Sequence, residues 1–118
     1  MPRNISFSMT TEQIRNRTKT VTRRKGWRQL QCGTILNACR KCMGLRPGET
    51  IEKLATIRVV DVQREPLDLM MSPGYGDGEC RMEGFPKMKG PEFVEMFVKH
   101  MGGTSDQEVT RIEFEYVD

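Results

Sequence analysis

Three things are scarce in this sequence, and the first two argue against particular classes of protein. No apolar run approaches the length of a membrane-spanning helix, so we expect no transmembrane segment and no membrane partner. No apolar leader precedes the first strand-like residues, so we expect no secretory signal and a cytoplasmic location, where thiols stay reduced. Acids are almost missing from residues 1–46, which hold 11 Lys or Arg and one acid, Glu12.

The separation of charge along the chain leaves two interpretations open. Residues 47–118 hold 8 Lys or Arg against 15 Asp or Glu, although the whole chain carries a net charge of only +3. A basic half favours an anionic partner, above all RNA. Alternatively, the two halves neutralise each other inside the fold.

The four cysteines show no regular metal-binding pattern. Cys39 and Cys42 make one CxxC, but there is no second CxxC, and the spacing of Cys32 and Cys80 is irregular. A four-thiolate zinc site and a redox pair are the alternatives. We expect free thiols, no metal and no other cofactor.

Apolar periodicity divides the chain into short elements, and its length favours one domain over residues 1–118. The patterns predict strands over residues 5–9, 33–39, 54–62 and 108–117, and helices over 10–16 and 91–101. The third strand is expected to end before Pro66, which disfavours a continued ladder. Glycines at 74, 76 and 78 predict a mobile loop over residues 67–82.

This order of elements predicts the fold class. Strands dominate, and no repeat of about 30 residues joins strand, helix and strand, so a doubly wound parallel sheet is not expected. A small, mostly antiparallel β-barrel with short peripheral helices fits best, and the class is α+β, mainly β. Residues 5–9 and 109–117 are expected in the same sheet system, and a monomer is favoured.

The run over residues 17–24 is the main candidate for a functional site. It contains four cations and three threonines around one apolar residue. If it is extended, Lys19 lies on the opposite face from Thr22, but a twist or bulge can bring the two together. Such a site could hold an anion, or the lysine could activate the threonine hydroxyl. The alternative is a solvated basic strand rich in threonine.

The spacing of this run resembles the signature of the ASCH superfamily, roughly Gly-x-Lys-x-x-Thr-x-Arg. Lys19, Thr22 and Arg24 match its Lys, Thr and Arg, whereas Arg17 stands at its Gly position. Glu83, in Glu-Gly-Phe-Pro, is the best match for the later acidic residue of that family. The resemblance implies a PUA-like β-barrel, and the chain also looks like phage-encoded members of the group.

The resemblance further implies a link to RNA or modified nucleosides, with three hypotheses. In the first, the chain hydrolyses an N4-acylated cytidine without metal. Lys19 is then a base with a lowered pKa, Thr22 is the nucleophile, and Glu83 either carries a proton or holds the substrate amine; a ribonuclease is a less favoured enzyme. In the second, the chain binds RNA or a modified nucleotide without chemistry. In the third, it is a phage interaction protein with a vestigial pocket. The candidate binding residues are Arg17, Arg23, Arg24, Trp27 and Tyr75.

Overall fold

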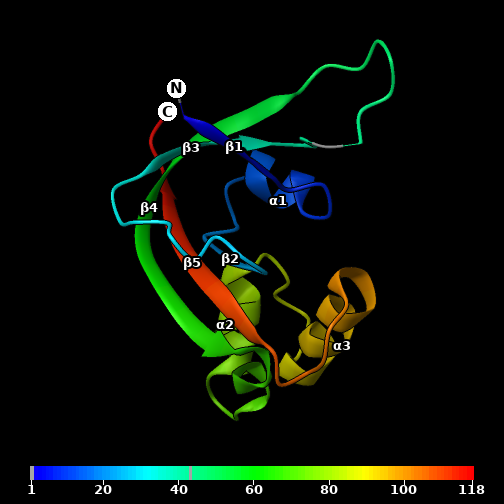
Figure 1. The fold of residues 1–118 in the computed structure, drawn as a ribbon. Helices are drawn as coiled ribbons and strands as arrows, with labels where there is room; N and C mark the ends of the chain where they lie inside the picture. The colour runs from blue at the N-terminus through cyan, green and yellow to red at the C-terminus, as the bar shows by residue number, and fades with distance from the viewer. Residues whose placement is uncertain (1, 43) are drawn as a thin grey trace.

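The computed structural model describes residues 2–42 and 44–118, and its framework is one curled five-stranded sheet (Figure 1). The strands are β1 (Arg3–Ser6), β2 (Val21–Arg24), β3 (Ile35–Cys39), β4 (Lys53–Pro66) and β5 (Glu108–Tyr116), in the spatial order β1-β3-β4-β5-β2. The β1–β3 pair is parallel, and the other three pairs are antiparallel. The sheet therefore forms a mixed half-barrel whose two edges are β1 and β2.

The helices lie in the hollow of the curved sheet (Figure 1). They are α1 (Thr11–Arg15), the 3-10 helix η1 (Leu67–Met71), α2 (Gly76–Met82) and α3 (Gly90–Met101). Pro91 occupies the first turn of α3, where its missing N–H costs no hydrogen bond. Among the described residues, no helix is long and apolar enough to cross a membrane.

Two apolar clusters pack against this sheet. The first lies under β1, β3 and α1 and includes Ile5, Phe7 and Ile14. The second joins η1, α2 and α3 and includes Met70 and Phe93. Strand β5 contributes to both clusters, so one continuous ladder of β4 and β5 connects them.

The fold class predicted from the sequence is confirmed, and so is the placement of both terminal strands in one sheet. Helix α3 begins one residue before the predicted range. Two other boundaries differ by more. Residues 7–9 leave the strand and Met9 is exposed, while β4 continues to Pro66, which pairs with Glu108 at the end of the ladder. A register shift between Val59 and Asp61 explains why Val60 is exposed within an otherwise apolar run.

The prediction of a mobile loop over residues 67–82 is wrong. This segment forms η1 and α2, and its residues Leu67, Met70 and Cys80 are buried in the second cluster. Local glycine content suggested mobility, but burial of these side chains and of Gly76 against η1 stabilises the helical conformation. The glycine is a packing residue here rather than a source of flexibility.

Replacing Gly76 by alanine is expected to destabilise the chain by about 1–3 kcal/mol, because an added Cβ would lie 1.8 Å from the Met70 carbonyl oxygen. Gly78→Ala is the matched control in the same helix, since its Cβ would meet only the end of the Arg81 side chain at 3.9 Å. We expect that control to be neutral or slightly stabilising. Urea unfolding of both variants measures the difference, and equal midpoints would contradict the packing role of Gly76.

Candidate active site

The Lys19 and Glu83 side chains meet inside the protein, although the sequence separates them by 64 residues. Lys19 Nζ donates one hydrogen bond to Glu83 Oε1 and one to the Glu83 backbone carbonyl, each at 2.8 Å. Both side chains are 3% exposed. Burial lowers the pKa of Lys19 below its ordinary value of 10.5; Glu83 opposes this shift, and Arg24 and Arg23 reinforce it.

The turn after α2 sets the position of Glu83. Gly84 follows with a φ of +96°, a conformation that favours glycine, and an added Cβ would lie 2.7 Å from Gln13 Cγ. Gln13 Nε2 donates to the Gly84 carbonyl at 3.3 Å, and Thr20 N donates to the Met82 carbonyl at 2.8 Å. The segment that carries Lys19 is thereby joined to the one that carries Glu83.

Thr22 and Arg24 form a second polar pair beside the first. Both belong to β2, and Thr22 is buried. Arg24 Nε donates to Thr22 Oγ1 at 3.0 Å, and another Arg24 nitrogen donates to the Ser6 carbonyl at 2.6 Å. Since Thr22 Oγ1 accepts from Arg24, its own hydroxyl proton remains available to another acceptor.

These residues line a cavity of about 250 Å³ between the two apolar clusters. Its polar wall holds Lys19, Thr22, Arg24 and Glu83. Its apolar wall consists of Phe85 and the α3 residues Phe93, Met96, Phe97 and Met101, together with Phe7 and Met9. The cavity thus combines a desolvated amine, a hydroxyl and a carboxylate with an apolar face for part of a ligand.

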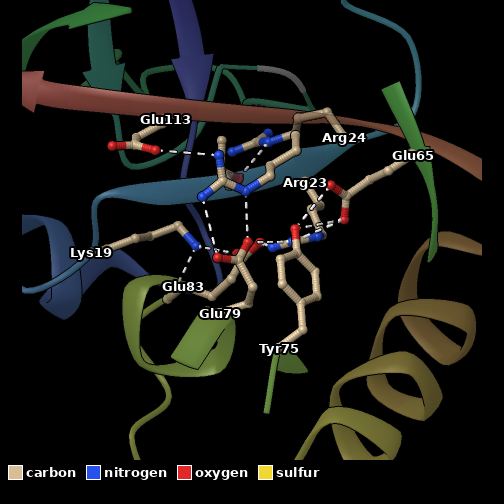
Figure 2. A network of polar contacts seen from close by, with 10 residues as sticks. Lys19, Arg23, Arg24, Glu65, Tyr75, Glu79, Glu83 and Glu113 are labelled. Atoms are coloured by element: carbon tan, nitrogen blue, oxygen red, sulfur yellow. Dashed lines mark hydrogen bonds and ion pairs between the residues drawn. The ribbon is translucent and has the colours of Figure 1, made fainter. Parts of the chain in front are cut away.

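Glu83 belongs to a network of buried charges that is centred on Arg23 (Figure 2). The Arg23 guanidinium, whose side chain is fully buried, contacts Glu83 at 2.9 Å, Glu65 at 3.1 Å and Glu79. Burial alone would lower the pKa of Arg23, but these carboxylates more than offset it and raise that pKa. Among the described residues, Arg23 Nε is the one buried side-chain nitrogen or oxygen without a hydrogen-bond partner.

The network continues to β5 through Glu79. Arg111 Nε donates to Glu79 Oε1 at 2.6 Å, and Tyr75 donates to Glu65 Oε1 at 3.0 Å. Burial would raise the pKa of Glu79, but its hydrogen bonds to Arg111 and Arg23 lower it overall. The three carboxylates of this network therefore balance the charges of its two arginines and Lys19. This balance holds the Glu83 carboxylate in place beside Lys19, the candidate base.

Several residues predicted to bind nucleic acid make contacts within the protein instead of facing solvent freely. The Arg23 side chain is buried among three carboxylates, although the residue also lines the cavity, so its assignment to ligand binding stays a prediction. Arg17 is exposed but pairs with Asp118 at 2.9 Å and lies over the Tyr116 ring. Tyr75 packs on the second cluster, and burial together with Glu65 raises its pKa to about 12. Arg24 lines the cavity.

Sequence reasoning missed the outer part of this site. Glu65, Glu79 and Arg111 complete the charge network, and α3 supplies the apolar wall. The helical spacing of the α3 side chains was visible, but nothing local indicated which surface they face. No pattern distinguishes Glu79 from an exposed acid, since its partners lie on distant strands.

The four cysteines are free in the structure. Cys80 is buried in the second cluster, where burial raises the pKa of its thiol to about 11. Among the described residues, no group of three or more His, Cys, Asp or Glu is arranged to hold a metal. The absence of a stoichiometric metal from the cysteines stays a prediction.

Comparison with solved structures defines the fold family. Hypothetical protein PH0355 aligns with a TM-score of 0.65 at 17% identity, over 99% of this chain and 100% of that chain. Protein EF3133 from Enterococcus faecalis V583, of family DUF984, gives 0.63 at 18% identity, over 100% and 81%. A point mutant of ZmASCH from Zymomonas mobilis gives 0.59 at 13% identity, over 100% and 76%.

The fold is therefore ASCH-like and PUA-like, as the signature over residues 17–24 implies. No protein-family model matches the sequence, and no curated protein matches it. At these identities the likeness describes the fold alone, so function has to be argued from the cavity.

Proposed function

We propose that the chain is a hydrolase of the amide bond in an N4-acylated cytidine, with Lys19 as general base and Thr22 as nucleophile. The observation that carries the proposal is the desolvated Lys19–Glu83 pair, which lines the same cavity as Thr22. At about 250 Å³, the cavity is close to the lower end of ligand pockets, about 300–1,000 Å³. That volume suits one acylated base.

The hydrogen bonds of Lys19 support its use as a base. A neutral lysine amine has two N–H donors and one lone pair. The two acceptors on Glu83, its carbonyl and Oε1, match the two donors and leave the lone pair free for the Thr22 proton. Glu83 thus orients the amine, while burial lowers its pKa toward the range in which a base works.

The proposed reaction has two stages. Thr22 Oγ1 attacks the acyl carbonyl carbon while its proton passes to Lys19 Nζ. The amide C–N bond then breaks as Lys19 returns the proton to N4, which releases cytidine and leaves an ester on Thr22. Lys19 next takes a proton from water while the resulting hydroxide attacks the ester carbonyl carbon, and Lys19 returns that proton to Thr22 Oγ1 as the ester C–O bond breaks. The products are a carboxylic acid and the free Thr22 hydroxyl.

Release of cytidine from N4-acetylcytidine, followed by chromatography, tests the proposal. We expect turnover by the unmodified chain and a loss of about 100-fold or more in Thr22→Val, which keeps the shape but removes the hydroxyl. Thr22→Ser is the matched control and should retain measurable turnover. Absence of cytidine release by the unmodified chain, or equal rates in the valine variant, would refute the proposal.

The same ion pair supports a second candidate, a non-catalytic reader of modified nucleotides. A carboxylate 2.8 Å from Lys19 favours the charged amine, which opposes its action as a base. A pocket that only binds would tolerate that state. Calorimetric titration with N4-acetylcytidine that gives saturable binding without cytidine release would favour this candidate.

A further inference from the structure

The cations of the basic half fall into two groups in the structure. Those that pair with carboxylates of residues 47–118 are Arg15, Arg17, Lys19, Arg23 and Arg40. Within the described part of the chain, those that pair with no carboxylate include Arg3, Arg24, Arg28 and Lys41. Neutralisation between the two halves is therefore incomplete, and the unpaired cations remain available to an anionic partner.

These four unpaired cations line two adjoining hollows, and the second of these adjoins the cavity. An outer hollow of about 470 Å³ contains Arg3, Trp27 and Arg28. An inner hollow of about 400 Å³ shares Trp27 with it and contains Lys41 and Arg24. The inner hollow shares Ser6, Ser8 and Arg24 with the cavity. Among the described residues, no Asp or Glu lines either hollow. We call Arg3, Arg24, Trp27, Arg28 and Lys41 the basic groove.

Trp27 is held in place at the middle of the basic groove. Its φ is +55°, a left-handed conformation that is uncommon for a bulky residue, and Gly26 before it has a φ of +82°. Thr110 Oγ1 donates to the Gly26 carbonyl at 2.5 Å, which supports this turn. Strained residues of this kind cluster at functional sites. The Arg3 guanidinium carbon lies 4.3 Å from the centre of the Trp27 ring. The guanidinium is a flat cation on which a nucleotide base can stack.

We infer that the basic groove binds the phosphates of single-stranded RNA, so that the nucleotide entering the cavity belongs to a strand. Arg24 lies at the junction of groove and cavity, and burial lowers its pKa to about 10, so it stays charged at neutral pH. A desolvated cation without a carboxylate partner is stabilised by an anion. The inference depends on the proposed function only for the chemistry in the cavity.

Binding of a fluorescent 12-nucleotide RNA at increasing salt tests the groove directly. Four neutralised phosphates predict a slope of log affinity against log salt of about −3. The triple variant R3Q/R28Q/K41Q should reduce it to about −1. The control K53Q/K87Q/K99Q removes the same charge from residues outside both hollows and should keep a slope of about −3. If the triple variant does not fold, R28Q/K41Q leaves the Arg3–Trp27 stack intact and should give about half the original slope.

Three results would refute RNA binding by the basic groove. They are no RNA binding at about 50 mM salt, equal slopes in the groove and control variants, or displacement of RNA by polyglutamate of equal length at an equal concentration. The last result would mean that the surface accepts any polyanion.

Comparing kcat/KM on an RNA substrate and on a free nucleoside tests this inference separately from the proposed function. The unmodified chain should have a kcat/KM about tenfold or more higher for acylated cytidine within the 12-mer than for the free nucleoside. The triple groove variant should lose that preference and keep its rate on the free nucleoside. If neither substrate is hydrolysed but the salt slopes of the groove and control variants differ, the proposed function is refuted and RNA binding by the basic groove is supported. Equal rates on both substrates together with equal slopes would refute the groove and leave the hydrolase intact.

Discussion

Replacing Lys19 by methionine is expected to lower kcat/KM for N4-acetylcytidine by about 100-fold or more. Methionine keeps an apolar stem in the buried position but removes the amine that contacts Glu83. Glu83 keeps its ion pair with Arg23, so the variant should fold. Glu83→Gln should cause a similar loss. The double variant should be no worse than the more damaged single variant, because the two groups act as a unit.

The dependence of kcat/KM on pH distinguishes a base from a binding contact. If Lys19 must be neutral, kcat/KM should rise with pH along a limb whose midpoint lies below the ordinary lysine pKa of 10.5. Glu83 raises the pKa of Lys19, so the limb in Glu83→Gln should move to lower pH. Methionine at position 19 should abolish the limb. Additive losses in the double variant, or a limb that survives K19M, would contradict the assignment.

Replacing Arg23 by methionine is expected to destabilise the chain by about 3–5 kcal/mol, the largest stability effect that we predict. The change leaves Glu65, Glu79 and Glu83 buried without the guanidinium that they share. Removing one member of a buried charge network costs far more than removing an exposed pair. The free energy of unfolding, obtained from urea denaturation at neutral pH, measures the effect.

Arg58→Met is the matched control, because Arg58 pairs with Glu115 on the exposed face of the sheet. We expect a loss of about 0–1 kcal/mol there. Arg23→Lys should recover only part of the stability, since one ammonium cannot reproduce the planar donors that reach three carboxylates. A methionine variant at position 23 as stable as the one at position 58 would show that the network contributes little.

Local patterns in the sequence were enough to predict the elements and the inner residues of the site. Alternation in residues 109–117 and the apolar stripe of residues 91–101 predicted β5 and α3, because one buried face imposes a period on a strand or helix. The spacing of Lys19, Thr22 and Arg24 depends on neighbouring backbone positions, so it was also readable locally. The signature also led to Glu83, although no periodicity placed that residue near Lys19.

Which charged side chains are buried in ion pairs and which have no carboxylate partner depends on the folded arrangement of distant segments. Arg23 and Arg24 are adjacent and both line the cavity, yet Arg23 lies among carboxylates from β4 and α2, whereas Arg24 contacts Thr22 and the Ser6 carbonyl. The segment over residues 67–82 became helical because distant side chains bury it, against its glycine content. Ion pairs and packing depend on residues that are far apart along the chain, and local patterns contain no record of those distances. For this reason, composition indicated that residues 1–46 are basic, whereas the fold determined which of their cations have no carboxylate partner.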